Sequence, residues 1–367
     1  MKSRPDSRQA ASLVTPIDLR LNPPTTLCDR GETIAGLALS RVEREDTIML
    51  SVRILAAAAA LALLAGAASA QTVGIATGPQ ATPTNATGSA IAKVVNEASG
   101  LQTRAVPHTS VDVAMPALNR AQSDFGIASI DLADTAFRGV EQFDGRKLGN
   151  IRVVARLFPL NVGIVVRKDS SIRTGAGLKG KRYPSEFTAQ KGVVKVSAAL
   201  LANAGLTYKD VVGVPVPNTS RGNEDFIQGK SDSAMLALGA ARLKQTDAQV
   251  GGIRILPIDT SPAGMERMKK IMPHAYAYQL KAGALSGADA ETPIMAYDLL
   301  LVAAAQTKDD IVYQAVKAMH QGKSKLVAVT PVFRDFEAAK MHTHYQGLQY
   351  HPGAVKYYQE AGVALSN

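Results

Sequence analysis

Short apolar runs alternate with amphipathic segments through most of the chain after residue 70. In the first unit, the apolar run Val73–Ala76 is followed by a loop rich in Thr, Gly and Pro, Thr77–Thr87, and then by helical spacing over Ser89–Asn96. The same reasoning predicts a helix over Val111–Arg120 capped by Thr109 or Ser110, and strands at Leu101–Pro107, Asp124–Ala128, Ile151–Ala155 and Val162–Val166. Strands that alternate with helices favour a parallel sheet with covered faces.

The pattern restarts after a polar, glycine-rich boundary at residues 167–180. A second strand-to-helix loop, Pro184–Gln190, leads into a predicted helix that ends near Ala204. Extended runs follow at Asp210–Val216, Asp232–Leu236 and Gly252–Leu256. Beyond Pro273 the spacing predicts amphipathic helices over Thr292–Ala305 and Lys308–His320.

Two similar halves in this order predict an α/β fold of two lobes. Each lobe is expected to be a mixed, mainly parallel sheet with helices on both faces, and the ligand cleft is expected between the lobes. We assign residues 71–165 and 260–367 to the first lobe and residues 166–259 to the second, so that the chain crosses between the lobes twice.

Residues 49–70 have the features of a secretory signal peptide. Arg53 makes a short basic start, Ile54–Ala65 is an uncharged apolar stretch, and Ala68-Ser-Ala70 has the small residues that a signal peptidase requires. The alternative, a transmembrane anchor, needs a longer and more strongly apolar span. We therefore predict cleavage after Ala70 and export to the periplasm. Residues 1–48 are interpreted as a disordered extension that results from a mis-assigned start codon.

Composition and charge exclude several function classes. The single cysteine, Cys28, precedes the signal peptide, so the predicted mature chain has no thiol for a disulfide, a metal or a nucleophile. The net charge of +10 comes from scattered basic residues without a nucleic-acid-binding motif, so no nucleic acid is expected as a partner. Since no P-loop, dinucleotide-binding glycine pattern or Ser-His-acid order is apparent either, the sequence predicts neither an enzyme nor a cofactor.

A set of short motifs resembles, in order and spacing, one family of binding proteins. The motifs are Ala76-Thr-Gly78, Gly88, Thr109-Ser110, Ser123–Asp131, Gly163–Ser170, Leu178–Arg182 and Gln228–Ala234. Together they resemble the TAXI subgroup of the solute-binding proteins of tripartite ATP-independent periplasmic (TRAP) transporters, over nearly the whole mature chain. The resemblance implies a type II-like periplasmic binding protein that captures a small organic anion and passes it to the membrane permease subunits of a TRAP transporter. We expect a monomer.

The loops that would hold the ligand depart from the family pattern. The first loop lacks the tyrosines that usually make an aromatic wall, and Gly177 stands where the family usually has Asp. The second loop, Pro184–Gln190, lacks the glycines that let backbone approach a ligand closely. The identity of the ligand is therefore not transferred beyond a carboxylate, with a dicarboxylate or an acidic amino acid as further options.

Helix N-termini carry the chemistry of the expected site. Both loops lead into a helix, where the first backbone N–H groups have no intrahelical partner and the macrodipole is positive, so each end attracts an anion. If the lobes face each other, both ends can hold one carboxylate, and Ser and Thr hydroxyls can complete its hydrogen bonds. The candidate ligand-binding residues are Thr77, Gly78, Thr84, Asn85, Ser110, Ser129, Asp131, Ser185, Thr188 and Asn218.

Most of these candidates keep a second interpretation. Each Ser or Thr at a helix start is as well explained by N-capping as by ligand contact. Asp131 could accept a ligand ammonium group, or it could form a structural salt bridge or cap. Arg182 and Arg221 could grip a carboxylate or lie in solvent, and Tyr276 and Tyr278 could line the site or pack in the core. His342, His344 and His351 lack a companion acid, so no metal site is predicted.

Two other functions fit the same predicted fold. The chain could serve an ATP-driven importer, or it could be a periplasmic sensor module that reports its ligand to a membrane kinase. An enzyme is the least favoured reading, because a fold hosts catalysis only where the site supplies reactive groups.

Overall fold

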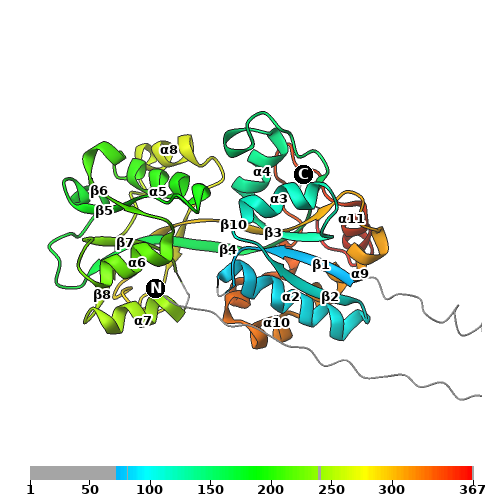
Figure 1. The fold of residues 1–367 in the computed structure, drawn as a ribbon. Helices are drawn as coiled ribbons and strands as arrows, with labels where there is room; N and C mark the ends of the chain where they lie inside the picture. Colours follow the sequence, from blue (N-terminus) through cyan, green and yellow to red (C-terminus); the bar gives the residue numbers. More distant parts are fainter. Residues whose placement is uncertain (1–71, 81, 239–240, 366–367) are drawn as a thin grey trace, which may run out of the picture. The chain divides into compact units, whose positions relative to one another are not determined.

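Two long antiparallel strands, β4 (Ile151–Arg167) and β10 (Thr292–Ala304), form the centre of the fold (Figure 1). The computed structural model describes residues 72–80, 82–238 and 241–365. The other strands in this part of the chain are β1 (Thr72–Thr77), β2 (Gln102–Pro107), β3 (Phe125–Ser129), β5 (Arg182–Glu186), β6 (Val212–Val216), β7 (Ser233–Ala237), β8 (Ile253–Ile255) and β9 (Tyr276–Leu280).

The helices of the described part are α2 (Pro83–Ser99), α3 (Val111–Asn119), α4 (Ile130–Arg138), α5 (Lys191–Asn203), α6 (Thr219–Ile227), α7 (Ala241–Gln249), α8 (Pro262–Ile271), α9 (Asp309–Gln321), α10 (Lys323–Val329) and α11 (Pro352–Glu360). Short 3-10 turns are η1 (Glu141–Phe143), η2 (Gly175–Leu178), η3 (Tyr208–Asp210), η4 (Pro331–Asp335) and η5 (Ala338–Lys340).

The main sheet is mixed and contains eight strands. Its path follows the order β2-β1-β3-β10-β4-β7, while β9 pairs with β10 and β8 pairs with β4. Strands β1, β2 and β3 are parallel, whereas β4 and β10 run antiparallel to each other and to their other neighbours. A separate parallel pair is formed by β5 and β6.

Helices cover both faces of the main sheet, as the alternation of side chains along β10 requires. Leu300 and Val302 pack in a cluster with residues of α3, α4 and α5. Leu301 and Ala303, one position along, pack in a second cluster with α2, α9 and α11. Figure 1 shows α3 and α4 on one side of the first strands and α2 with α10 on the other. A third cluster joins α6 and α7 to β7 and β8.

These contacts group the elements into two lobes. Strands β1–β3 pack with α2, α3, α4, α9, α10 and α11, and strands β5–β8 pack with α5, α6, α7 and α8. Strands β4 and β10 belong to both groups, because β4 pairs with β7 and β8 at its C-terminal end and β10 pairs with β3 at its own. The predicted α/β class with two lobes is confirmed, but antiparallel pairs are more extensive than predicted, since β4 and β10 run in opposite directions between the lobes.

Some predicted elements are wrong. The first three residues of the predicted loop Pro184–Gln190 form the end of strand β5. Residues Thr292–Ala305 were expected to be an amphipathic helix, but they form strand β10. Apart from Pro293, every residue of β10 is buried, because the strand lies in the middle of the sheet and is covered on both faces. A fully buried run has no polar face to reveal its period, so burial overrides the helix propensity of its Ala, Leu and Met residues. The separate strands predicted at residues 151–155 and 162–166 are parts of the single strand β4.

The contacts bear on the lobe boundaries as well. Helix α8 packs against α5, and β9 pairs with the first half of β10. We therefore propose that the second lobe ends within β10 instead of at residue 259. The predicted extension at residues 1–48 and signal peptide at residues 49–70 lie outside the described residues. Among the helices of the described residues, none has the length and apolar character that a bilayer span needs.

A buried ion pair joins the two central strands. Arg156 Nε on β4 lies 2.9 Å from Asp298 Oδ1 on β10, and both side chains are nearly inaccessible. The hydroxyl of Tyr276 on β9 donates to Asp298 Oδ1 at 2.8 Å, and the hydroxyl of Tyr345 donates to Oδ2 at 2.8 Å. Burial and the charge of Asp298 raise the pKa of both tyrosines, so they remain neutral donors. Asp298 thus holds β9 and the C-terminal segment against the strands that both lobes share.

We expect Asp298→Asn to destabilise the protein by about 3 kcal/mol, because the variant leaves the buried Arg156 without its counter-charge. Equilibrium urea unfolding measures this loss. Asp144→Asn is the matched control, since Asp144 is exposed, and it should change stability by less than about 0.5 kcal/mol. Equal stabilities of the two variants would show that the ion pair contributes nothing.

Candidate functional site

A cavity of about 240 Å³ lies where the two lobes meet. Its floor is made by the shared strands, through Leu160 and Val162 of β4 and Tyr297 and Leu299 of β10. The wall from the first lobe consists of Gly78, Pro79, Thr82, Pro83, Thr84, Ser110, Val111, Asp112, Ser129, Asp131, Leu132, Glu141 and Gln142. The wall from the second lobe consists of Gln190, Lys191, Gly192, Val193, Lys195, Val196, Thr219, Met235, Ala237 and Met272.

Three helices of the first lobe begin at this cavity. Their N-cap side chains are Thr82 for α2, Ser110 for α3 and Ser129 for α4. Each hydroxyl oxygen accepts a hydrogen bond from a backbone N–H of the first turn, at 3.4, 3.3 and 3.2 Å respectively. Helices α2 and α4 follow the C-terminal ends of the parallel strands β1 and β3, which is where α/β sheets place their ligand crevices.

Gly78 lets the first turn of α2 approach the end of β1. A Cβ atom at this position would lie 2.7 Å from Thr84 Oγ1, which is too close for a side chain. The absence of a side chain therefore brings the start of α2 to the cavity wall.

Two helices of the second lobe begin at the same cavity. Gln190 precedes α5, and its Oε1 accepts hydrogen bonds from the backbone N–H of Thr219 at 3.0 Å and from the Thr219 hydroxyl at 3.3 Å. This side chain therefore ties the start of α6 to the start of α5. Glu186, the last residue of β5, and Phe187, which follows it, have φ of 68° and 40°, in the left-handed region. Without glycine, this conformation costs about 1 kcal/mol or more per residue.

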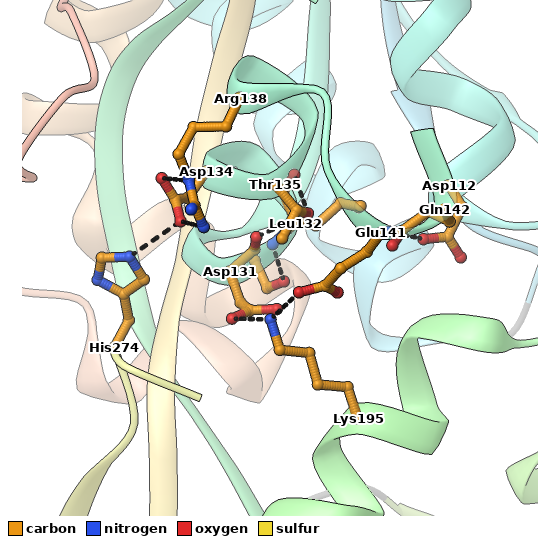
Figure 2. A network of polar contacts seen from close by, with 11 residues as sticks. Asp112, Asp131, Leu132, Asp134, Thr135, Arg138, Glu141, Gln142, Lys195 and His274 are labelled. Atoms are coloured by element: carbon orange, nitrogen blue, oxygen red, sulfur yellow. Dashed lines mark hydrogen bonds and ion pairs between the residues drawn. The ribbon is translucent and has the colours of Figure 1, made fainter. Parts of the chain in front are cut away.

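Charged contacts connect the lobes across the cavity (Figure 2). Lys195 on α5 lies with its Nζ 3.0 Å from Asp131 Oδ1 and 2.7 Å from Glu141 Oε1, both in the first lobe. Nearby, His274 Nε2 lies 3.7 Å from Asp134 Oδ2 on α4. The acids of α4 and η1 thus face cationic or titratable groups of the second lobe.

A carboxylate of the first lobe also faces the N-terminus of α5. A Cβ atom on Gly192 would lie 3.5 Å from Asp112 Oδ1, and the same oxygen accepts a hydrogen bond from Gln142 Nε2 at 3.0 Å. Burial raises the pKa of Asp112, while hydrogen bonds from Gln142 and the Gly192 backbone oppose the rise. Asp112 therefore lies where an anion bound at the N-terminus of α5 would be expected.

Burial dominates the electrostatics of the central pair. It raises the pKa of Asp131, against the opposing charge of Lys195. Burial lowers the pKa of Lys195, but the hydrogen bonds and charges of Glu141 and Asp131 outweigh that effect and raise it overall. Lys195 is therefore a protonated cation whose partners are side chains of the opposite lobe.

The structure brings together part of the predicted site. Gly78, Thr84, Ser110, Ser129 and Asp131 line the cavity. For Asp131, the salt bridge with Lys195 agrees with the structural interpretation. Ser110 and Ser129 are N-caps that also line the cavity, so the same side chains cap a helix and face the space where a ligand would lie.

The other predicted residues lie outside the cavity lining. Thr77 is buried at the end of β1 and accepts a hydrogen bond from Asn85 Nδ2 at 3.0 Å. Ser185 is buried on β5, Thr188 is exposed, and Asn218 caps α6 through a bond from the Arg221 N–H at 2.9 Å. For Thr77 and Asn85, the cause is the early start of α2 at Pro83, which places Asn85 in the first helical turn with its side chain pointing back to β1. Pro at the first helical position after a Thr cap is a sequence signal for the start of α2, and the loop prediction did not use it.

The arginine, tyrosine and histidine side chains for which the sequence left a second role open have partners within the protein. Arg182 pairs with Asp232 at 2.6 Å and Arg221 pairs with Asp225 at 3.1 Å, both away from the cavity.

Tyr276 contacts Asp298, and Tyr278 packs beside the third cluster. His342 stacks on Tyr350 at 4.2 Å between centroids, and His351 caps α11. Among the described residues, no group of three or more His, Cys, Asp or Glu side chains could hold a metal ion.

Sequence reasoning missed several cavity residues. Tyr297, which supplies an aromatic side chain, lies in the segment predicted as a helix. Lys191 and Lys195 do carry a signal: cations in the first turns of a helix oppose its dipole, so they point to partners from another element. Asp112 and Glu141 carry no comparable signal, since acids in the first turn are ordinary.

Comparisons with known proteins give a family and similar folds for this chain. Residues 75–362 match the model of a family described as NMT1-like. Among solved structures, the chain is similar to MatC from Rhodopseudomonas palustris with bound malate, at 13% identity over 73% of this chain and 90% of that chain, with a TM-score of 0.50. It is also similar to a TctC solute-binding protein from Polaromonas, at 13% identity over 72% and 88% of the two chains, with a TM-score of 0.46. The likeness to MatC supports the two-lobe binding-protein fold.

We expect Lys195→Met to destabilise the protein by about 2 kcal/mol at neutral pH, because Asp131 loses its partner while it stays buried. The variant should also raise the pKa of Asp131 further above its usual 3.8, since the charge of Lys195 now opposes that rise. A carboxyl with a raised folded-state pKa binds more protons in the folded protein, so stability falls as the pH rises above the unfolded value. The deficit of the variant should therefore grow from about pH 4 to about pH 7.

Urea unfolding across this pH range measures the deficit. Glu141→Gln is the control: Glu141 is 42% exposed, so its loss should cost less than about 1 kcal/mol and should vary less with pH. A pH-independent deficit in Lys195→Met would contradict the role given to Asp131.

Proposed function

The chain belongs to the NMT1-like family, and we propose that it acts as an extracytoplasmic solute-binding protein for a small organic anion. One observation carries the proposal: the N-termini of helices from both lobes line a single cavity. Helix ends offer backbone donors and a positive potential, so the arrangement supports capture of a carboxylate. The likeness in fold to MatC, whose structure contains malate, is consistent with this proposal.

Closure of the lobes is the proposed binding step. A ligand in the cavity touches both walls and the floor only when the lobes are together, so its binding favours the closed arrangement by the difference in contacts. The proposed hinge is the pair of shared strands. Their pairing shifts register between Leu299 and Leu300 and between Leu301 and Val302, and such irregularities bend strands.

The proposal includes a membrane partner. The sequence motifs that resemble the TAXI subgroup support delivery of the ligand to the permease subunits of a TRAP transporter, after export to the periplasm and cleavage behind Ala70. Genes for such subunits beside this gene are expected, and genes for an ATP-driven importer or a sensor kinase in their place would favour those alternatives. N-terminal sequencing of the exported protein tests the cleavage site.

Isothermal titration of the mature protein with a panel of small carboxylates should detect binding, and solution scattering should show compaction on addition of the bound acid. If no acid of the panel binds or compacts the protein, the proposed function is wrong.

We expect Val193→Trp to block the cavity and to weaken binding at least about tenfold. Val193 lines the cavity and is only half-buried, so the larger ring has room to extend into the cavity. Val212→Trp is the matched control, because Val212 is 53% exposed on β6 and does not line the cavity. The control should bind as the wild type does, and titration of the same acid compares the two.

A further inference from the structure

We propose that the cavity selects organic acids that have one anionic group and an apolar remainder, and that it discriminates against dicarboxylates. This inference rests on the proposed function and narrows its ligand class. It follows from the charges and the surface character of the cavity walls.

The charged side chains of the cavity carry no positive surplus. Among the described residues that line it, the acids are Asp112, Asp131 and Glu141, and the bases are Lys191 and Lys195. Two positive charges against three negative ones leave a formal charge of −1. A ligand with two anionic groups would therefore enter a cavity whose walls carry a net negative charge. Like charges that are brought together without solvent repel strongly.

Lys195 already pairs with two carboxylates of the protein, and Lys191 lies near a third. Lys195 Nζ lies within 3.0 Å of Asp131 and 2.7 Å of Glu141. Lys191 lies close enough to Asp112 for its charge to act on that carboxyl group. The N-terminus of α5 faces the same Asp112, as described above. Lys195 of the second lobe is thus matched by two acids of the first lobe, and Figure 2 shows Asp131 and Glu141 converging on it.

The first lobe retains donors for one anionic group. The starts of α2, α3 and α4 meet the cavity. The Thr82 hydroxyl donates to the Pro79 carbonyl oxygen at 2.6 Å, so the hydroxyls of Ser110 and Ser129 and the first backbone N–H groups are the donors that one carboxylate at this wall would meet.

The rest of the cavity is mainly apolar. Leu160, Val162, Val196, Met235, Met272 and Leu299 line it. An alkyl or similar remainder gains by contact with these side chains, whereas a second carboxylate placed against them would lose its hydration without gaining a partner. Charge and surface therefore both favour a ligand with a single acidic end.

The test compares acids of equal chain length that differ only in the second carboxylate. Butanoate is paired with succinate and hexanoate with adipate, and each is titrated into the mature protein at constant pH and ionic strength. We expect the monoacid of at least one pair to bind about tenfold or more tightly than its diacid. Equal or tighter binding of the diacids overturns the inference and leaves the proposed function standing. Binding by none of these acids, nor by any in the wider panel, overturns both.

A charge variant tests the cause of the discrimination. Glu141→Gln removes one negative charge from the wall at a partly exposed position, so the ratio of monoacid to diacid affinity should fall about twofold to fivefold. Glu337→Gln makes the same charge change at an exposed residue outside the cavity and should leave the ratio unchanged. The same ratio in both variants would show that wall charge does not set the preference.

Discussion

The antiparallel pairing of β4 and β10 is the constraint on which the rest of the structure depends. These strands cross the middle of the sheet, pair with strands of both lobes and are buried almost throughout. Because each strand belongs to both lobes, their side chains form the floor of the cavity that the lobes enclose. The ion pair between Arg156 and Asp298 lies on the same strands, and its tyrosine partners come from β9 and from the C-terminal segment. Stability and the position of the site therefore have a common origin.

The cavity combines two kinds of wall that serve different purposes. Helix N-termini supply directed donors whose positions are set by the ends of strands, and they need no side-chain charge to hold an anion. The charged side chains are instead used largely between the lobes, where Lys195 meets Asp131 and Glu141. Most of the formal charge in the site thus acts between the lobes, and hydrogen bonds with apolar contacts remain for the proposed ligand.

Local patterns in the sequence predicted the elements whose signals are local. The apolar run before Thr77, the capping Ser110 and the alternation of strands and helices are such signals, and they were sufficient for the α/β class with two lobes. Strand β10 was out of reach, because a segment buried on both faces shows neither a period of two nor one of 3.6. The same error hid Tyr297. The position of Lys195 near the start of α5 indicates a partner from another element, but it does not identify that partner. Its meeting with Glu141 depends on how α5 lies against η1, which no local pattern encodes.

For the proposed delivery of the ligand to a membrane partner, the contact of Lys195 with the first lobe has a consequence. Side chains that complement one another across the cleft stabilise the closed arrangement even when nothing is bound, so some empty molecules adopt the shape of loaded ones. If the docking partner recognises only the closed shape, empty molecules compete with loaded ones for the same docking site. The rate of delivery then depends on the ratio of loaded to empty protein and not on the amount of loaded protein alone.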